Sequence, residues 1–316
     1  MRTSSTRAGV RLSSSRTRSF LATVALAATA VALAACGGSA APQPVATATV
    51  TASPSATASV GSVSPTPSAS PSSTVTSTLT VYFLRPIGGA QPLRGPFVAT
   101  AHRFVPVTLG VAKAAMSALL AGPTARERAI GMTSDVPAGT TLRGVKIAGG
   151  VATVDLSSAF AATGTKAAMT ARLAQVVYTL THFAGVRGVL FKVDGTPLAT
   201  FGATGVSFAR PQRRADFEAV TPPILVESPA PFDAVWGTAR VSGTADVFEA
   251  TFRARLVVGT AARTLTVTAS SGSGTRGVFA FSLPLPGDGV GKLVVWDASA
   301  ENGAALHTVT IPLVAK

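Results

Sequence analysis

The spacing of hydrophobic and polar residues divides most of the chain into two regions of different secondary structure. In residues 79–208, short β-branched or aromatic runs alternate with segments in which apolar residues recur every three or four positions. The first pattern is typical of strands and the second of amphipathic helices. We therefore expect an α/β (α+β) domain in which helices cover one face of a small sheet. The expected strands are Thr78–Leu84, Phe97–Val105, Thr141–Ile147, Val151–Leu156 and Gly188–Val193, and the expected helices are Val107–Leu120 and Met169–Phe183.

The second region, residues 224–316, shows no helical period. About seven short alternating runs in roughly 90 residues, separated by Gly, Pro and Ser, are typical of an immunoglobulin-like β-sandwich. Residues 209–223, which contain several Arg and Pro, are interpreted as the linker between the two domains. The expected strands are Ile224–Glu227, Arg240–Ser242, Glu249–Val257, Arg263–Thr268, Val278–Leu283, Lys292–Trp296 and His307–Leu313. The aromatic residues expected in the core are Phe248, Phe252, Phe279, Phe281 and Trp296.

Residues 36–78 have a different composition and predict a disordered tether. Of residues 37–78, 19 are Ser or Thr, six are Pro and none is charged. Without a hydrophobic period, such a segment cannot bury enough surface to offset the entropy of ordering it. We expect a flexible, partly extended spacer, either unmodified or carrying O-linked glycans.

Residues 1–35 predict a lipoprotein signal peptide. Five Arg precede Phe20–Ala35, an uncharged aliphatic run that is shorter than the roughly 20 residues of a membrane-spanning helix. The run ends in Leu33-Ala34-Ala35-Cys36, which resembles the bacterial lipobox. That resemblance implies cleavage before Cys36 and a diacylglyceryl group on its thiol, so that the mature protein is extracytoplasmic, lipid-anchored to the cell membrane and facing the cell wall. The alternatives are an ordinary signal peptide with an incidental Cys, or an uncleaved anchor.

Composition and charge narrow the range of functions. A single Cys excludes an internal disulfide framework and Cys-based zinc or iron–sulfur sites. Residues 79–220 hold 15 basic and 6 acidic side chains, whereas residues 221–316 hold seven of each. The basic excess is expected either to be spread out or to form a face that attracts phospholipid headgroups or an anionic wall polymer. Export disfavours nucleic acid. The residues of this possible face are Arg126, Arg128, Arg143, Lys146, Arg210, Arg213 and Arg214.

No motif in the sequence supports a catalytic, cofactor or metal site. The GxGxxG match at Gly272–Gly277 is followed by an expected strand, whereas a dinucleotide site requires a helix there. The histidines are isolated in the sequence, and they are expected to be structural. The two aspartates that could form a carboxylate pair, Asp155 and Asp194, fall at a strand end and a turn, where Asp satisfies local backbone donors. The histidines are His102, His182 and His307.

Several blocks of residues resemble known families. The middle region resembles the GerMN domain of bacterial sporulation and germination proteins, through Leu119–Thr124, Val136–Thr140, Val151–Ser157, Leu173–Thr181 and Phe191–Gly195. The C-terminal region resembles the immunoglobulin-like Gmad domain, through Val241–Ala245, Glu249-Ala250, Gly277–Phe279 and Asp297–Gly303. The resemblance implies envelope lipoproteins, a GerMN fold similar to the ring-building motifs of secretion assemblies, and no catalytic residue set. The Ala- and Arg-rich, Asn-poor composition is associated with actinobacteria.

Three functional hypotheses follow. The first is a non-catalytic cell-envelope lipoprotein of the spore-germination or sporulation type, which acts as a binding or scaffolding module through an envelope protein partner, self-association or an anionic wall polymer. The alternative is a solute- or cell-wall-binding lipoprotein that feeds a transporter or sensor kinase, and it predicts a concave, partly apolar pocket between the domains. The third is an envelope hydrolase, which requires a pocket with clustered His, Asp or Glu.

Overall fold

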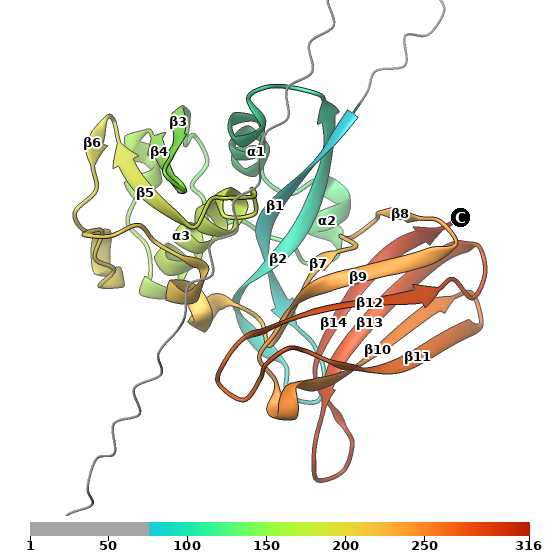
Figure 1. Ribbon diagram of the computed structural model, residues 1–316. Coiled ribbons are helices and arrows are strands. Elements are labelled where there is room, and N and C mark those ends of the chain that lie inside the picture. The colour runs from blue at the N-terminus through green and yellow to red at the C-terminus, as the bar shows by residue number, and fades with distance from the viewer. Residues whose placement is uncertain (1–75) are drawn as a thin grey trace, which may run out of the picture. The chain divides into compact units, whose positions relative to one another are not determined.

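The computed structural model describes residues 76–316 (Figure 1). The predictions for the signal peptide, Cys36 and nearly all of the tether lie outside the described residues. Among the residues described, no helix combines the length and the apolar character needed to cross a membrane. The architecture agrees with the expected fold class, because a domain of helices and sheets precedes an all-β, immunoglobulin-like domain.

The first domain begins with a long two-stranded antiparallel ribbon. It consists of β1 (Thr76–Ile87) and β2 (Leu93–Pro106), and both strands are longer than the sequence predicts. All six residues from Leu79 to Leu84 are buried. Because successive side chains of a strand point to opposite faces, this run must be covered on both faces.

Two helices separate the ribbon from a second sheet. The four-stranded sheet has the order β3-β4-β5-β6, in which only the pair β4–β5 is parallel. Helix α1 contacts β1 and β3, and helix α3 contacts β1, β2 and β5, so the helices lie between the two sheets (Figure 1). The expected single sheet is therefore divided in two. The elements are α1 (Val111–Leu120), α3 (Lys166–Leu180), β3 (Leu142–Ala148), β4 (Val151–Leu156), β5 (Gly188–Val193) and β6 (Thr196–Pro197).

Polar side chains on α3 complete the free edge of β1. Tyr82 in β1 donates its backbone N–H to Thr179 Oγ1 (3.2 Å), and its carbonyl accepts from Gln175 Nε2 (3.2 Å). Gln175 and Thr179 are both fully buried. Buried backbone polar groups need partners, and here helix side chains supply the bonds that a third strand would otherwise make.

The helices of the first domain differ from the prediction in the bounds of α1 and α3 and in one additional helix; α3 begins and ends three residues earlier than expected. Helix α1 begins at Val111, four residues later than expected, and Val107 and Leu109 before it are exposed. Helix α2 (Ala125–Ala129), which was not predicted, begins with a capping box that pairs Thr124 with Glu127. That S/T-x-x-E pattern is a recognised helix-start signal. The short 3₁₀ helices are η1 (Ser158–Ala161), η2 (Gly202–Thr204), η3 (Arg214–Val220) and η4 (Phe248–Ala250).

The C-terminal domain is a sandwich of a five-stranded and a three-stranded sheet, in the orders β11-β10-β13-β14-β8 and β12-β9-β7. All seven expected strands are present, and β8 is an additional two-residue strand. Their bounds are β7 (Ile224–Ser228), β8 (Ala234–Val235), β9 (Thr238–Ala245), β10 (Thr251–Val258), β11 (Ala261–Thr268), β12 (Gly277–Pro284), β13 (Gly289–Ala298) and β14 (Ala305–Ala315).

The core prediction for this domain is correct for three aromatic residues and wrong for two. Phe252 and Phe279 are buried in edge-to-face contact, and Phe281 packs against the core. Trp296 is only half-buried and faces away from the core. Leu293 and Val295 of the same strand point into the core, and successive side chains of a strand point to opposite faces, so Trp296 points outward. Phe248 is 66% exposed. The two residues after it, 249 and 250, have φ values of 54° and 55°, which break the alternation before β10 begins.

Candidate functional site

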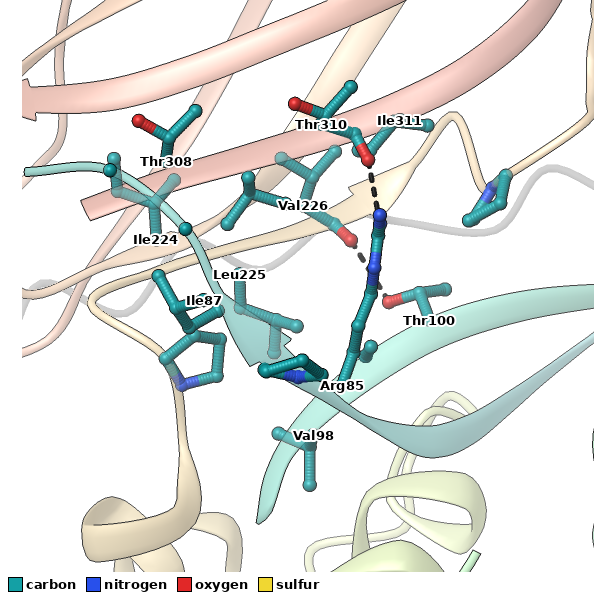
Figure 2. Close-up of a pocket in the computed structure, with 17 residues that line it drawn as sticks. Arg85, Ile87, Val98, Thr100, Ile224, Leu225, Val226, Thr308, Thr310 and Ile311 are labelled. Atoms are coloured by element: carbon teal, nitrogen blue, oxygen red, sulfur yellow. Dashed lines mark hydrogen bonds between the residues drawn. The ribbon is translucent and has the colours of Figure 1, made fainter. Parts of the chain in front are cut away.

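A pocket of about 340 Å³ lies where the ribbon meets β7 and β14 (Figure 2). Ile87 and Val98 line it from the ribbon. Ile224 and Val226 contribute from β7, and Ile311 from β14. Ligand pockets in proteins typically occupy about 300–1,000 Å³ and have mostly apolar walls. The pocket therefore has the size and the lining of a site for a small molecule.

The geometry of the ribbon brings its end to β14. The register of β1 and β2 shifts between Arg85 and Ile87, on either side of Pro86, which has no N–H to donate to the ladder. Beyond this point Gly88 and Thr308 exchange two backbone hydrogen bonds, of 3.1 and 2.8 Å. Gly89 follows with φ +108°, and a Cβ there would lie 2.3 Å from a β14 carbonyl oxygen. Only glycine permits this approach.

Arg85 crosses from the ribbon to the sandwich along one wall of the pocket (Figure 2). Its Nη1 donates to the carbonyl of Thr310 (2.6 Å) and its Nε to the carbonyl of Ile130 (3.0 Å). Beside it, the hydroxyl of Thr100 donates to the carbonyl of Val226 (2.9 Å). Side chains thus satisfy backbone carbonyls on both sides of the junction.

Arg85 carries the only charge among the residues that line this pocket. It forms no ion pair with any residue between 76 and 316. Burial lowers the pKa of its guanidinium from the usual value. Arginine starts from a pKa above 12, so the group remains positively charged near neutral pH. The result is a cation beside apolar walls with no acidic partner.

A partly buried polar network lies near the pocket and also joins the two domains. Arg214 donates to Glu227 (2.6 Å) and to Tyr82 Oη (3.2 Å), and Tyr82 donates its hydroxyl to Glu227. The guanidinium of Arg214 lies 5.2 Å from the ring centroid of Tyr82 and 4.7 Å from that of Tyr178. His182 Nδ1 lies 3.2 Å from Tyr82 Oη.

The charges of this network stabilise one another. Burial alone would raise the pKa of Glu227, but Arg214 and the hydrogen bond from Tyr82 hold that pKa below its usual value. Burial is also the main reason that the pKa of Tyr82 is well above its usual value and that of His182 is lowered. Glu227 is therefore charged at neutral pH, whereas Tyr82 and His182 are neutral. The network is built to hold the junction together.

The three histidines occupy separate places. His102 bonds Asp233 (2.7 Å) across the domain junction, and His307 bonds Asp297 (2.9 Å) within the sandwich. His182 lies just beyond the C-terminal end of α3. Among the described residues, no three His, Cys, Asp or Glu side chains form a group that could hold a metal ion.

The two aspartates make contacts with residues that are distant in the sequence. Asp155 Oδ1 accepts from the backbone N–H of Gly195 (3.0 Å). Asp194, at φ 49°, forms a 2.5 Å ion pair with Arg143. Neither contact is the local turn bond predicted from sequence, because Gly195 is 40 residues from Asp155 and Arg143 is 51 residues from Asp194. The GxGxxG segment is followed by β12, so the strand predicted there is present.

The basic residues named from sequence are largely engaged with neighbours. Arg214 belongs to the partly buried network, and Arg143 and Arg210 pair with Asp194 and Asp216. Arg126 lies over the Phe232 ring, with its guanidinium 4.3 Å from the ring centroid. Arg128 donates to the carbonyl of Pro123. The expected basic face is thus reduced by these pairings, and Arg214 is removed from it.

Four residues of the junction, Arg85, Thr100, Tyr82 and Glu227, were not predicted as site residues from sequence. For two of them, the sequence contains a pattern that indicates a special role. Arg85 interrupts the apolar run Val81–Ile87, and Glu227 ends the apolar run that begins at Ile224. A charged residue inside a strand that is otherwise buried needs a partner or a function.

Comparisons with known proteins agree with this architecture. Residues 80–199 match the family model Germane, described as sporulation and spore germination. Residues 223–304 match Gmad2, described as the immunoglobulin-like domain of bacterial spore germination. A search of curated proteins finds no significant match.

Three solved structures are similar to parts of the chain. The first GerMN domain of the sporulation protein GerM from Bacillus subtilis is 22% identical over 44% of this chain and 99% of its own, with a TM-score of 0.36. The tandem GerMN domains of the same protein are 16% identical, covering 67% and 62%, with a TM-score of 0.38. A putative lipoprotein from Clostridium perfringens is 18% identical, covering 46% and 93%, with a TM-score of 0.32. By the family models, residues 80–199 are similar to the Germane family and residues 223–304 to the immunoglobulin-like Gmad2 family.

Proposed function

We propose that the protein is a non-catalytic binding module of the cell envelope, held at the outer face of the cell membrane by a lipid on Cys36. The observation that carries this proposal is the junction of the two domains. Arg214–Glu227 and His102–Asp233 bridge it, and Gly88 and Thr308 join β1 to β14. Two domains connected in this way present a continuous surface to one partner. The families that match both domains are those of sporulation and spore germination.

The partner in this proposal is another envelope protein or a second copy of this chain. The test is crosslinking of the full-length protein in its own envelope, followed by purification and mass spectrometry. A reproducible protein partner, lost when a variant opens the junction, is the expected result. Retention of polymer alone, with no protein crosslink, contradicts the scaffolding role and favours an anionic wall polymer.

The anchor is tested separately. Cys36→Ser removes the only thiol of the chain, so metabolic labelling with an alkyne fatty acid should fall to background and the protein should leave the membrane fraction. Ser39→Ala, three residues away, is the matched control and should behave as the parent protein. Labelling that persists in Cys36→Ser would show that the anchor lies elsewhere.

A second candidate function is favoured by the junction pocket. A solute-binding lipoprotein requires a concave, partly apolar pocket between the domains, and the pocket around Arg85 has those properties. The pocket contains no His, Asp or Glu, which are the residues that a hydrolase would need there.

A further inference from the structure

We propose that the junction pocket binds a small amphipathic carboxylate, with its acid group on Arg85 and its aliphatic chain between the ribbon and β7. This inference rests on the second candidate function and specifies its ligand. It is independent of the envelope partner. Three observations support it: the volume of the pocket, the chemistry of its walls and the unpaired charge at its side.

The volume limits the ligand to a short chain. At about 30 Å³ for each water molecule, the cavity of about 340 Å³ has room for roughly eleven waters. A ligand of about ten non-hydrogen atoms, such as octanoate, fills a similar space. A phospholipid or a folded peptide is too large to be enclosed.

The walls favour an aliphatic body. Ile87, Val98, Ile224, Leu225 and Ile311 surround the cavity, and they come from strands whose other contacts hold them in place (Figure 2). Burial of each additional methylene group strengthens binding by about fourfold while the chain still fits. Affinity should therefore rise from hexanoate to octanoate and stop rising once the cavity is full.

The positive charge of Arg85 determines that the ligand is negatively charged. Arg85 uses Nε and Nη1 for the carbonyls of Ile130 and Thr310, and its Nη2 has no hydrogen-bond partner among the described residues. A guanidinium offers five N–H donors in a planar arrangement that fits a carboxylate. Because no acidic side chain lines the pocket, an anion gains this interaction and a cation is repelled.

A purely structural role is the competing explanation for Arg85. Its two known bonds tie the ribbon to β14 and to the loop after α2, and this tie would be useful without any ligand. The two explanations differ in what they predict for ligand chemistry. A structural tie alone gives no reason for an anion to be preferred over a cation of the same length.

The test is photolabelling of the full-length protein in isolated membranes with an octanoate analogue that carries a diazirine on its chain. Label is expected on peptides that contain residues 222–231 and 306–312. Excess octanoate should suppress the label. Octanol should need about a tenfold higher concentration for the same suppression, and octylamine should not suppress the label at these concentrations. Labelling outside the pocket, or equal competition by octylamine and octanoate, overturns the proposal.

Substitutions separate the contribution of the Arg85 charge to ligand binding from that of the apolar cavity. Arg85→Gln should raise the octanoate concentration for half-suppression by about tenfold or more and leave the octanol value unchanged. Ala99→Leu adds bulk to the pocket wall and should abolish labelling, whereas Arg94→Gln, an exposed control outside this pocket, should have no effect. An unchanged octanoate value in folded Arg85→Gln overturns the proposal. If Arg85→Gln does not fold, the labelling of Ala99→Leu and the competition by octylamine still test the proposed carboxylate site. Neither measurement affects the crosslinking test of the proposed scaffolding function.

Discussion

Replacement of Glu227 by Gln removes one charge from the partly buried network at the domain junction and changes little else. Glu227 accepts from Arg214 Nη1 (2.6 Å) and from the hydroxyl of Tyr82, and the side chains of the ion pair are only 26% and 20% exposed. Gln keeps the size of the side chain and one acceptor oxygen, but leaves Arg214 without a counter-charge.

The expected cost follows from this geometry. Hydrogen bonds to charged groups contribute about 1.5–3 kcal/mol, and loss of one member of a fully buried ion pair costs about 3–5 kcal/mol. Because this pair is partly exposed and Arg214 keeps its stacking on Tyr82 and Tyr178, we expect a loss of about 2 kcal/mol in the free energy of unfolding. Glu218→Gln is the matched control: Glu218 also pairs with an arginine but is 45% exposed, so its loss should cost at most about 1 kcal/mol.

Urea unfolding of the full-length protein at several pH values measures both quantities. The pKa of Glu227 is lowered in the folded state, so its charge stabilises the fold above the unfolded pKa of about 4.3. That contribution is lost as the pH falls through the lower, folded-state pKa. The difference between parent and Glu227→Gln should therefore be constant at neutral pH and shrink in acid. A difference below about 0.5 kcal/mol at pH 7, or one that grows in acid, would refute the reasoning.

Three further substitutions test the fold. Gly89→Ala places a Cβ 2.3 Å from a β14 carbonyl at φ +108° and should destabilise the protein by about 2 kcal/mol or more, whereas Gly144→Ala, with no atom within 4 Å, should change the unfolding midpoint little. Thr124→Ala removes the capping box of α2 and should cost about 1 kcal/mol in urea unfolding. Phe252→Ala should lower the free energy of unfolding by about 3–5 kcal/mol, whereas Phe248→Ala, at a position 66% exposed, should change it by no more than about 0.5 kcal/mol. Equal effects of the two substitutions would contradict the assignment of Phe252 to the core and Phe248 to the surface.

Local pattern was sufficient for most elements of the fold. The hairpin Thr141–Leu156, the long buried helix and the seven strands of the sandwich appear where periodicity and glycine placement predict them. Residue type misled the prediction of the sandwich core at two positions. Trp296 and Phe248 are large and apolar, as core residues are, but the strand alternation set by Leu293 and Val295 and the positive φ of residue 249 turn them outward.

The sequence by itself determined the two domain types and the order of most of their elements. Only the tertiary structure decided that β1 and β2 leave the first sheet as a separate ribbon, and that this ribbon reaches β14 to create the pocket beside Arg85. Arg85 and Thr310 are 225 residues apart in the chain. Periodicity reports which face of an element is apolar. It carries no information on which distant element covers that face, because this depends on packing across the whole chain.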